Sequence, residues 1–482
     1  MGCSPLRLRA SEFIFRIMRI LSKEILGKEG EEVELAGWVA VRRDHGKIIF
    51  IDLRDRSGIV QLVFTPKNQQ IYELANTLRS EWVIRVRGKV SVRPRGMENS
   101  ELPTGKLEIP VDRLEIITKA KTPPFEISGE GKDISEDIRM EYRYLDLRRP
   151  RLQENLRMRA RVIKFFRDYL MAKDFVEIET PILSKSTPEG ARDYVVPSRL
   201  HPGKFYALPQ SPQQYKQLLM VSGFEKYFQI ARVFRDEDTR GDRQPEHTQL
   251  DIEMSFITPK EVMDLVEGMV TEMVKTIYPQ KKVKIPWPRI NYEDAMGKYG
   301  SDKPDLRKDK NDPQELAFAW IINFPQFELD KNTKEIQPVH HMFVQPKEDS
   351  MLLIDKGPLK MISTQYDWVC NGYELASGSL RITDPVLQMK VFKLLGMDEK
   401  KAREDFGHML EAFEYGVPPH GGIAPGIDRL VMILQNEPNI REVIAFPKTG
   451  DGRDLMMHAP SSVSETQLKE LGLEIKKKNR NK

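Results

Sequence analysis

The sequence has few cysteines and no long hydrophobic run, and these absences exclude several classes of protein. Among 482 residues only Cys3 and Cys370 are cysteines, too few for a disulfide framework or a cysteine-based zinc site. No run of about 18 apolar residues occurs and 31% of the residues are charged, which excludes a helical membrane protein. Proline (32) and glycine (30) have ordinary frequencies, so collagen-like and low-complexity architectures are excluded. We therefore expect a soluble intracellular protein of two to four domains.

Two common nucleotide-binding motifs are also missing. The chain has no G-x-x-x-x-G-K-[ST] sequence, and no G-x-G-x-x-G follows a predicted strand. A bound nucleotide would have to be held in another way. Arginine side chains of an antiparallel sheet can do this by forming paired hydrogen bonds to the phosphates. Residues 1–17 lack the apolar core of a signal peptide, and Leu6 stands where N-myristoylation requires Ser or Thr. We interpret 1–17 as an N-terminal extension, with Met18 as an alternative start.

Positive charge is concentrated in the first quarter of the chain. Residues 1–125 contain 22 Lys and Arg against 16 Asp and Glu, and residues 42–95 contain 12 against 5. A basic small domain beside a near-neutral large one is typical of a nucleic-acid-binding module. A solvated sheet surface would produce the same excess, so charge alone does not separate the two interpretations.

Residues 18–120 have the pattern of a small β-barrel. Short alternating strands are predicted with one helix, 69–80, between the third and the fourth. The predicted strands are 33–43, 47–55, 59–65, 81–93 and 107–117. This order is typical of an OB-fold, which holds single-stranded nucleic acid by stacking bases on aromatic side chains over a basic groove. Candidate contacts in this region are Arg42, Arg43, Phe50 and Gln61, although Phe50 taken alone reads as a core residue.

The rest of the chain predicts a larger α+β domain. Residues 121–150 contain a Pro-Pro pair followed by polar sequence, and we interpret them as a hinge. A helical pattern then runs from 151 to about 173, before a short strand at 175–179. From there to 460 the pattern mixes helices with strands that read as antiparallel hairpins, and 461–482 reads as a solvated tail.

Two segments of the large domain have the composition of a nucleotide site. A highly charged stretch, 235–246, joins two predicted strands, and it is longer than a structural hairpin needs. The second segment, 421–430, is a glycine-rich entry into an apolar helix, where glycines allow the backbone to approach a ligand closely. Arg429 in the first turn of that helix could reach a phosphate.

These segments resemble conserved motifs of the class II aminoacyl-tRNA synthetases. Residues 234–246 are similar to their motif 2, 421–430 to motif 3, and the helix–strand unit that ends at Pro181 to motif 1. Residues 187–194, the Gln-Ser-Pro-Gln at 210–213 and the pair His340-His341 resemble the bacterial-type aspartyl-tRNA synthetases. The resemblance extends over roughly residues 30–460, with the motifs in the same order.

The resemblance implies an ATP-dependent ligase. In this family the α-carboxylate of aspartate attacks the α-phosphate of ATP, and the aspartyl group then passes to the 3′ end of tRNA. Arg235 would clamp the α-phosphate and the aspartate carboxylate, and Arg429 would hold the γ-phosphate as the second catalytic arginine. The implied aspartate-binding residues are Glu189, Gln213, Lys216, Arg235, His340 and Arg381. The implied ATP-binding residues are Arg235, Asp236, Glu237, Gln244, Glu374, Gly426, Ile427, Asp428 and Arg429. The implied Mg²⁺ ligands are Asp367 and Glu374.

Two of these residues bear on the choice of amino acid. Lys216 and Arg381 would face the side-chain carboxylate of aspartate, whereas burying two cations against the neutral amide of asparagine would be costly. This argues against an asparaginyl- or lysyl-tRNA synthetase of the same fold. A surface ion pair is the alternative interpretation of Lys216 and Arg381. For the His340-His341 pair the alternative is an ordinary polar loop.

The chain departs from the bacterial family in one large feature. Such enzymes usually carry an inserted domain of about a hundred residues between motifs 2 and 3. Here 299–307 is followed within some ten residues by 317–320, which resembles the sequence beyond that domain. We therefore expect the inserted domain to be absent near 307–317. A smaller departure is Met342, where proline is usual.

The barrel contains two positions that bear on tRNA specificity. Non-discriminating members of the family, which charge both tRNA-Asp and tRNA-Asn, tend to have His after Arg-Arg-Asp and Gly in a nearby Arg-Pro-x-Gly loop. His45 and Gly96 occupy these positions here. The implied anticodon contacts are Arg43, His45, Phe50, Gln61 and Gly96. A simple turn role for His45 is the alternative.

We therefore predict an α+β protein with an N-terminal OB-fold anticodon-binding domain and a class II antiparallel-sheet catalytic domain at 151–460. The expected function is cytoplasmic aspartate–tRNA ligation with ATP and Mg²⁺, by a homodimer without membrane association. The expected partners are L-aspartate, tRNA-Asp and tRNA-Asn, with a tRNA amidotransferase acting downstream. The alternatives are a synthetase restricted to tRNA-Asp and a non-catalytic RNA-binding paralogue, which would tolerate loss of Arg235 or Arg429.

Overall fold

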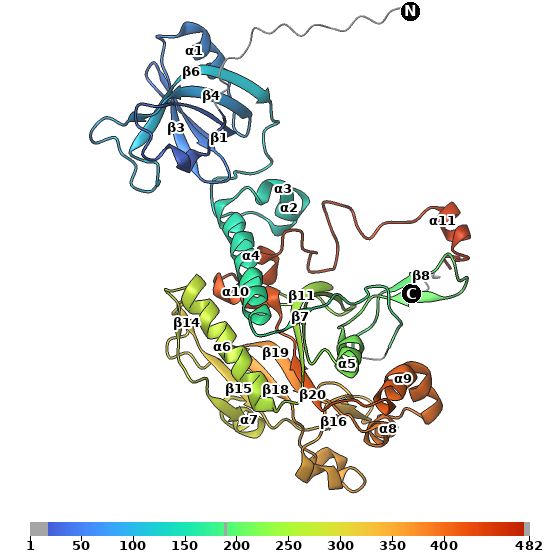
Figure 1. Ribbon diagram of the computed structural model, residues 1–482. Coiled ribbons are helices and arrows are strands. Elements are labelled where there is room, and N and C mark those ends of the chain that lie inside the picture. The colour runs from blue at the N-terminus through green and yellow to red at the C-terminus, as the bar shows by residue number, and fades with distance from the viewer. Residues whose placement is uncertain (1–17, 188–189, 477–482) are drawn as a thin grey trace, which may run out of the picture. The chain divides into compact units, whose positions relative to one another are not determined.

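The computed structural model describes residues 18–187 and 190–476 of the chain (Figure 1). The chain forms two compact units, which divide between Ile134 and Ser135, inside the stretch interpreted above as a hinge. The proposed N-terminal extension 1–17 lies outside the described residues, as do Glu189 and the last six residues of the proposed tail. In the described parts of the chain, no helix is long and apolar enough to cross a membrane.

The first unit is a closed β-barrel. Its elements are η1 (Ser22–Ile25), β1 (Glu32–His45), β2 (Ile48–Arg54), β3 (Ile59–Phe64), α1 (Gln69–Asn76), β4 (Val83–Lys89), β5 (Ser91–Val92) and β6 (Leu107–Thr118). The strands pair in the order β3-β2-β1-β4-β6-β5, and an additional parallel pairing of β3 with β6 closes the barrel. The predicted OB-fold is confirmed, with the helix after the third strand; only the predicted strand 81–93 is divided into β4 and β5.

Alternation along β1 explains why the barrel folds. Val33, Leu35 and Val39 are buried, while the intervening side chains are more exposed. Period-two burial of this kind directs one face of a strand into a core. Gly88 in β4 allows a close approach of two strands, because a Cβ there would lie 2.2 Å from the carbonyl oxygen of Pro110 in β6.

The second unit is built around an eight-stranded sheet in the order β13-β15-β18-β19-β20-β11-β10-β7. Most neighbours are antiparallel, and β13–β15 and β10–β7 are parallel. The strands of this sheet are β7 (Val176–Glu177), β10 (Lys226–Phe234), β11 (Glu246–Ser255), β13 (Arg289–Asn291), β15 (Phe318–Ile322), β18 (Tyr366–Cys370), β19 (Tyr373–Leu380) and β20 (His420–Ile423). Three small pairings use β8 (Val195–Pro197) with β9 (Phe205–Ala207), β12 (Lys282–Val283) with β14 (Glu315–Leu316), and β16 (Phe327–Leu329) with β17 (Ile336–Pro338). The predicted antiparallel catalytic sheet is confirmed.

Helices cover this sheet and complete its core. They are α2 (Glu136–Glu141), α3 (Arg143–Asp146), α4 (Pro150–Met171), α5 (Gln213–Val221), α6 (Pro259–Ile277), α7 (Tyr292–Tyr299), α8 (Pro385–Leu394), α9 (Glu399–Glu414), α10 (Ile427–Leu434) and α11 (Glu465–Glu470). Short 3-10 turns are η2 (Glu348–Leu353), η3 (Pro358–Lys360) and η4 (Ile440–Val443). The predicted helix after Pro150 is α4 (Figure 1). Its buried Val162 and Phe166 belong to one hydrophobic cluster with Val270 of α6 and Leu430 of α10.

A short connection, residues 300–314, joins α7 to β14. A polar contact ties it to the rest of the unit, since Lys282 Nζ lies 2.8 Å from Asp312. A second ion pair, between Arg307 and Asp305 at 2.7 Å, lies within the connection itself. Lys281, which is buried, donates to the carbonyl oxygen of Pro313 at 2.6 Å. The segment where we expect an inserted domain to be absent is thus a short loop held close to the unit.

Candidate active site

The antiparallel sheet carries a pocket of about 430 Å³ on its surface. Side chains of β11, β19, α5 and the start of α10 line it, together with the charged loop that joins β10 to β11. The predicted site residues among its lining are Gln213, Lys216, Arg235, Glu237, Gln244, His340, Glu374, Arg381, Gly426, Asp428 and Arg429. Motifs separated by up to about 240 positions therefore converge on one cavity, as the resemblance implied.

One end of the pocket contains the two predicted aspartate-binding cations. Lys216 of α5 and Arg381, just after β19, are almost fully buried. Lys216 Nζ lies 3.0 Å from Asp251 and 3.4 Å from Glu253, and both carboxylates belong to β11. Arg381 binds both oxygens of Glu253, at 2.8 Å through Nε and 3.0 Å through Nη2. The surface-pair alternative for these cations is wrong, because the network is buried.

The sequence analysis did not identify Asp251 and Glu253. Both have no exposed surface, and Asp251 also lines the pocket and accepts from Gln249 at 2.6 Å. Burial by itself would raise the pKa of Glu253, but the charges of Arg381 and Lys216 lower it to about 2. Two acidic residues that alternate with Leu250, Ile252 and Met254 were the signal that could have indicated buried charges, although not their partners.

The two histidines reach this end of the pocket from the loop after β17. His341 Nε2 lies 2.9 Å from a guanidinium nitrogen of Arg381, and His340 Nδ1 lies 3.4 Å from the Ser377 hydroxyl. Burial lowers the pKa of His340 to about 3, and the positive charges of Arg381 and Arg235 act in the same direction. Burial, and then the nearby His340 and Arg381, also lowers the pKa of His341 well below its ordinary value. Both rings can therefore offer polar nitrogen atoms to a ligand without adding charge.

Gln213 completes the described part of this end. Its side chain is buried at the start of α5, and its Nε2 donates to Gln217 at 2.9 Å. The predicted partner Glu189 lies outside the described residues. Its neighbour Gly190, which has a φ of 119°, lines the pocket.

The other end of the pocket is dominated by arginines. Arg235 follows β10, and its Nε lies 3.4 Å from the carbonyl oxygen of Gln210. Glu237 pairs with Arg243 at 3.4 Å across the same loop. The side-chain amide of Gln244 donates to the carbonyl oxygen of Lys448 at 3.0 Å and accepts from the backbone N–H of Lys448 at 2.7 Å. The amide of Gln244 therefore shapes the wall, a role that the sequence did not indicate.

Arg429 enters from the first turn of α10. Its guanidinium contacts the carbonyl oxygen of Glu374 and pairs with Asp242 at 3.1 Å. Its Nε is buried without a hydrogen-bond partner. Such a donor gains from an anionic ligand, because an unsatisfied buried polar group is costly.

Three predicted ATP-binding residues do not offer a free side chain to the cavity. Ile427 is fully buried in the core, and Asp236 pairs instead with Arg192 at 3.6 Å. Asp428 lines the pocket, but one of its oxygens binds Arg159 and the other accepts from the backbone of Thr248 at 2.8 Å. Close backbone approach at Gly426 and Ile427 remains compatible with a nucleotide.

The predicted metal ligands lie on the neighbouring strands β18 and β19. Glu374 lines the pocket, whereas Asp367 is buried beside it and accepts from Ser377 at 2.5 Å and Gln365 at 3.0 Å. Burial, and then the charge of Glu374, raises the pKa of Asp367 well above its ordinary value. Within the described ranges no cluster of three or more His, Cys, Asp or Glu side chains could hold a metal. A cation shared with substrate phosphates fits such a pair, since Mg²⁺ commonly binds through one or two carboxylates plus phosphates.

In the barrel, the predicted anticodon residues lie mainly on β1, β2 and β3. His45 is exposed, and Gly96 is exposed in the left-handed region at φ 84°. Arg43 pairs with Asp52 through two bonds of 2.7 and 2.8 Å, and Gln61 donates to Glu108 at 3.0 Å. Phe50 is opposite Arg43 in the register and only half-buried, so it is not a core residue.

Comparison with known proteins identifies both units. The family of class II tRNA synthetases (D, K and N) matches residues 135–450, and an OB-fold nucleic acid binding domain family matches residues 33–117. An aspartate–tRNA(Asp/Asn) ligase from Rubrobacter xylanophilus is 45% identical, covering 92% of this chain and 95% of the relative. A protein of the same name from Syntrophomonas wolfei is 43% identical over 93% of this chain and 97% of its own length. An aspartate–tRNA ligase from Bacillus licheniformis is 42% identical over 94% of this chain and 97% of its own length.

The alignment with the Rubrobacter relative spans 569 positions, so at least 87 of them (569 less 482) have no residue in this chain. Among solved structures, an asparaginyl-tRNA synthetase from Pyrococcus horikoshii with bound asparaginyl-adenylate matches with a TM-score of 0.72 at 24% identity, covering 90% of this chain and 98% of that one. A structure described as a putative aspartyl-tRNA synthetase from Leishmania major matches with the same TM-score at 21% identity, over 92% and 96%. At these identities the structural matches establish the fold.

Proposed function

Because the chain belongs to the class II tRNA synthetases of the aspartate, lysine and asparagine group, we propose that it is an aspartate–tRNA(Asp/Asn) ligase. The observation that carries this proposal is the pair of cations, Lys216 and Arg381, at the closed end of the pocket. Each is buried and hydrogen-bonded, so their geometry is fixed before a substrate arrives. A side-chain carboxylate satisfies such donors, whereas a lysine side chain would be repelled.

The proposed reaction needs no nucleophile from the protein. The α-carboxylate of aspartate attacks the α-phosphate of ATP, the bond to the β-phosphate breaks, and pyrophosphate leaves. A hydroxyl of the terminal tRNA ribose then attacks the activated carbonyl, and AMP leaves. Catalysis is therefore positioning together with stabilisation of charge on the phosphate. Arg235 lines the same cavity as Lys216 and Arg381, and its proposed role is to contact both the carboxylate and the α-phosphate.

Both ends of the cavity supply the remaining contacts. Arg429, with its unpartnered buried Nε, is placed to bind the γ-phosphate at the ATP end, and at the other end Asp251 and Gln213 offer oxygen atoms to the ammonium of the substrate. Asp367 and Glu374 would hold Mg²⁺, which neutralises phosphate charge when it is bound. His340 would also contact aspartate, and so would Glu189, which lies outside the described residues.

The barrel would bind the anticodon. Exposed His45 and Gly96, and half-buried Phe50 beside Arg43, present an aromatic and basic surface suited to unstacked bases. We propose that the small contacts at His45 and Gly96 tolerate the anticodons of both tRNA-Asp and tRNA-Asn. Aspartyl-tRNA-Asn would then require a downstream tRNA amidotransferase.

We further propose a homodimer. Strand β7 forms one edge of the large sheet, and Val176, Ile182 and Leu183 in and after it are exposed apolar residues. An open sheet edge with exposed apolar side chains is suited to pairing with a second copy.

ATP–pyrophosphate exchange tests the choice of amino acid. Purified protein with Mg²⁺ should catalyse exchange with L-aspartate and not with L-asparagine or L-lysine. Exchange with asparagine alone would overturn the aspartate assignment. Absence of exchange with all three, in protein that is folded, would favour the RNA-binding paralogue.

The second candidate is a synthetase restricted to tRNA-Asp, and the name of the Bacillus licheniformis relative favours it. It differs from the first candidate only in the anticodon contacts, so amino-acid exchange does not separate the two. Aspartylation of tRNA-Asp and of tRNA-Asn separates the two candidates.

A further inference from the structure

A polar stripe runs along one buried face of α4. Arg151, Asn155 and Arg159 are spaced four residues apart, which places them on the same side of the helix. Asn155 is 3% exposed, and the side chains of Arg151 and Arg159 are 12% and 15% exposed. Further along the helix the buried residues are apolar, as expected of a helix that packs on a sheet. The stripe is therefore a local departure from that pattern.

The C-terminal end of the stripe holds the start of α10. Arg159 forms an ion pair with Asp428, and the second oxygen of Asp428 accepts from the backbone of Thr248 at 2.8 Å. Asp428 immediately precedes Arg429, and Thr248 also lines the pocket. Arg159 thereby fixes the turn from which Arg429 projects.

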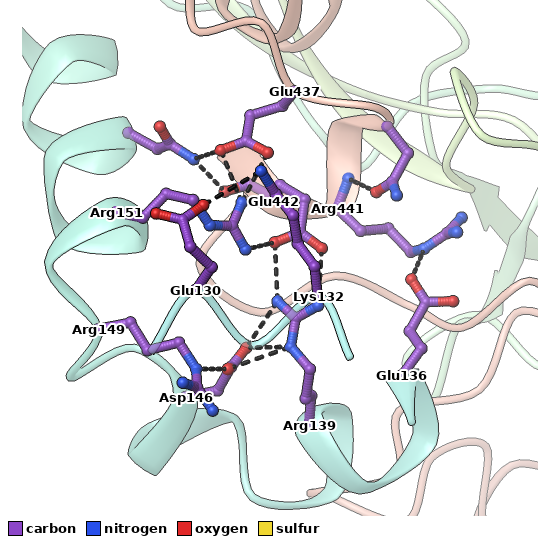
Figure 2. Close-up of polar contacts among 12 residues, drawn as sticks. Glu130, Lys132, Glu136, Arg139, Asp146, Arg149, Arg151, Glu437, Arg441 and Glu442 are labelled. Carbon is purple, nitrogen blue, oxygen red and sulfur yellow. Dashed lines mark hydrogen bonds and ion pairs between the residues drawn. The ribbon is translucent and has the colours of Figure 1, made fainter. Parts of the chain in front are cut away.

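The N-terminal end of the stripe holds η4 and the turn before it (Figure 2). Arg151 binds Glu437 at 2.6 Å and Glu442 at 2.8 Å, and Asn155 donates to Glu437 at 2.7 Å. Arg139 closes the cluster with two bonds to Glu442, at 2.8 and 3.1 Å. Although burial would raise the pKa of Glu442, these arginines keep it below its ordinary value, so it remains ionised.

The segment held in this way forms a wall of the ATP end. Ile440, the first residue of η4, lines the pocket, and its backbone N–H donates to the carbonyl oxygen of Gly241 at 2.9 Å. Gly241 lies in the charged loop next to Asp242, the partner of Arg429. The segments held by the two ends of the stripe therefore both line the ATP end of the cavity, around Arg429.

The amino-acid end is positioned by other elements. Lys216 and Arg381 are fixed by Asp251 and Glu253 of β11 and by Ser379 of β19. A buried ion pair contributes little net stability compared with well-packed apolar residues, and its best-supported use is to specify one arrangement. The stripe should accordingly act on the ATP end alone.

We propose that Arg151, Asn155 and Arg159 are positioning residues for ATP, acting through Glu442 and Asp428 on the walls around Arg429. The proposal rests on the proposed function, because it concerns the nucleotide site of that reaction. None of the three needs to touch ATP. Their role is to keep two separate segments, the start of α10 and η4, at a fixed distance across the phosphate end of the cavity.

Exchange kinetics of full-length variants test this role. Arg159→Ala should raise the KM for ATP about tenfold, the effect of losing roughly 1.4 kcal/mol of binding, while the KM for aspartate stays within about twofold. Arg159→Lys, which keeps the charge, should recover part of the ATP affinity. Lys164→Ala is the matched control on α4, since Lys164 is exposed and pairs with exposed Asp168, and it should leave both constants unchanged.

A purely structural stripe would give a different result. Equal rises in both KM values, or an unchanged KM for ATP in folded Arg159→Ala, would overturn the proposal. If Arg159→Ala does not fold, the KM values of Asn155→Ala for ATP and for aspartate test the proposal in its place. The ATP-dependent rise in Tm, measured without any amino acid, separates the two proposals. If the wild type binds ATP yet exchanges with no amino acid, the proposed function fails, and the stripe is still tested by the size of that rise in each variant.

Discussion

Arg381 and Glu253 form a buried ion pair with two hydrogen bonds, of 2.8 and 3.0 Å, at the closed end of the pocket. The pair leaves Nη1 of Arg381 directed to Ser379 at 2.6 Å and to His341 at 2.9 Å. The positive charges of Lys216 and Arg381 are thus balanced by Glu253 and Asp251 before aspartate binds. Such balance reduces the cost of burying two cations in the free enzyme.

Glu253→Gln should destabilise the protein by about 3 kcal/mol at pH 7, because it leaves Arg381 without its buried counter-charge. Chemical denaturation of the wild type and the variant measures this difference. Gln249→Leu tests an uncharged neighbour on the same strand and should cost less. A loss below about 1 kcal/mol for Glu253→Gln would contradict the charge-balance account.

The carboxylate of Glu253 also predicts a pH dependence of the free energy of unfolding. Its pKa is lowered from an ordinary value of 4.5 to about 2, so its contribution is complete above pH 4.5 and is lost as the pH falls from 4.5 towards 2. The free energy of unfolding of the wild type should therefore fall more steeply below pH 4.5 than that of Glu253→Gln. Parallel profiles for the two proteins would show that Glu253 is not held ionised by Arg381.

Removing both members of the pair should separate specificity from folding. Arg381→Leu with Glu253→Leu replaces a buried pair by apolar residues, a change that is often neutral for stability. Loss of the guanidinium should nevertheless lower kcat/KM for aspartate by about 100-fold or more, because a buried charge partner is missing. The ATP-dependent rise in Tm should persist, and an undiminished use of aspartate would contradict the role of Arg381.

Glu374→Gln should raise the Mg²⁺ concentration needed for half-maximal exchange by about tenfold, a typical cost of weakening a metal site. Of the two proposed metal ligands, Glu374 is the one that lines the pocket, and its neighbour Asp367 would remain as the single carboxyl ligand. Titration of Mg²⁺ at saturating ATP measures the change. Glu237→Gln is the control at the same end of the cavity, and an equal shift in both variants would argue for a general loss of negative charge.

Asp242→Asn should lower the KM for ATP by about two- to fivefold. Asp242 pairs with Arg429 at 3.1 Å and is partly exposed, so a phosphate must displace a pair worth about 1 kcal/mol or less. Exchange at varied ATP tests the change, with Asp238→Asn as the control in the same loop. A higher KM for ATP would mean that Asp242 assists ATP binding.

Much of the fold and the site could be predicted from sequence because the signals were local. Alternating residues in β1 and β2 identified the barrel, and the charged stretch 235–246 identified the loop after β10. The pairing of buried charges could not be predicted in this way. Asp251 and Glu253 lie on a strand that is buried on both faces, so the alternation gives no sign that they meet Lys216 and Arg381, which are distant in sequence.

Asp428 illustrates the same limit within the nucleotide site. The resemblance of its segment to motif 3 implied an ATP contact, but its carboxylate is occupied by Arg159, 269 positions away in the chain. The resemblance of separate motifs to the family implied where the site lies. It could not predict which polar groups of the site are already bound to other parts of the protein, because that depends on tertiary packing.

We expect the barrel to accept the anticodons of both tRNA-Asp and tRNA-Asn because of His45. His45→Leu should weaken charging of tRNA-Asn by about tenfold, the cost of one anticodon-base contact, and leave charging of tRNA-Asp within about twofold. Initial rates of aspartylation with each tRNA measure the two effects. An equal loss for both tRNAs would assign His45 a general role in binding.

The most direct test of the central claim is aspartylation of two purified transcripts, tRNA-Asp and tRNA-Asn, by the full-length protein with ATP and Mg²⁺. We expect aspartate to be attached to both, with rates of the same order. Charging of tRNA-Asp alone would contradict the non-discriminating assignment, and charging of neither would contradict ligase function.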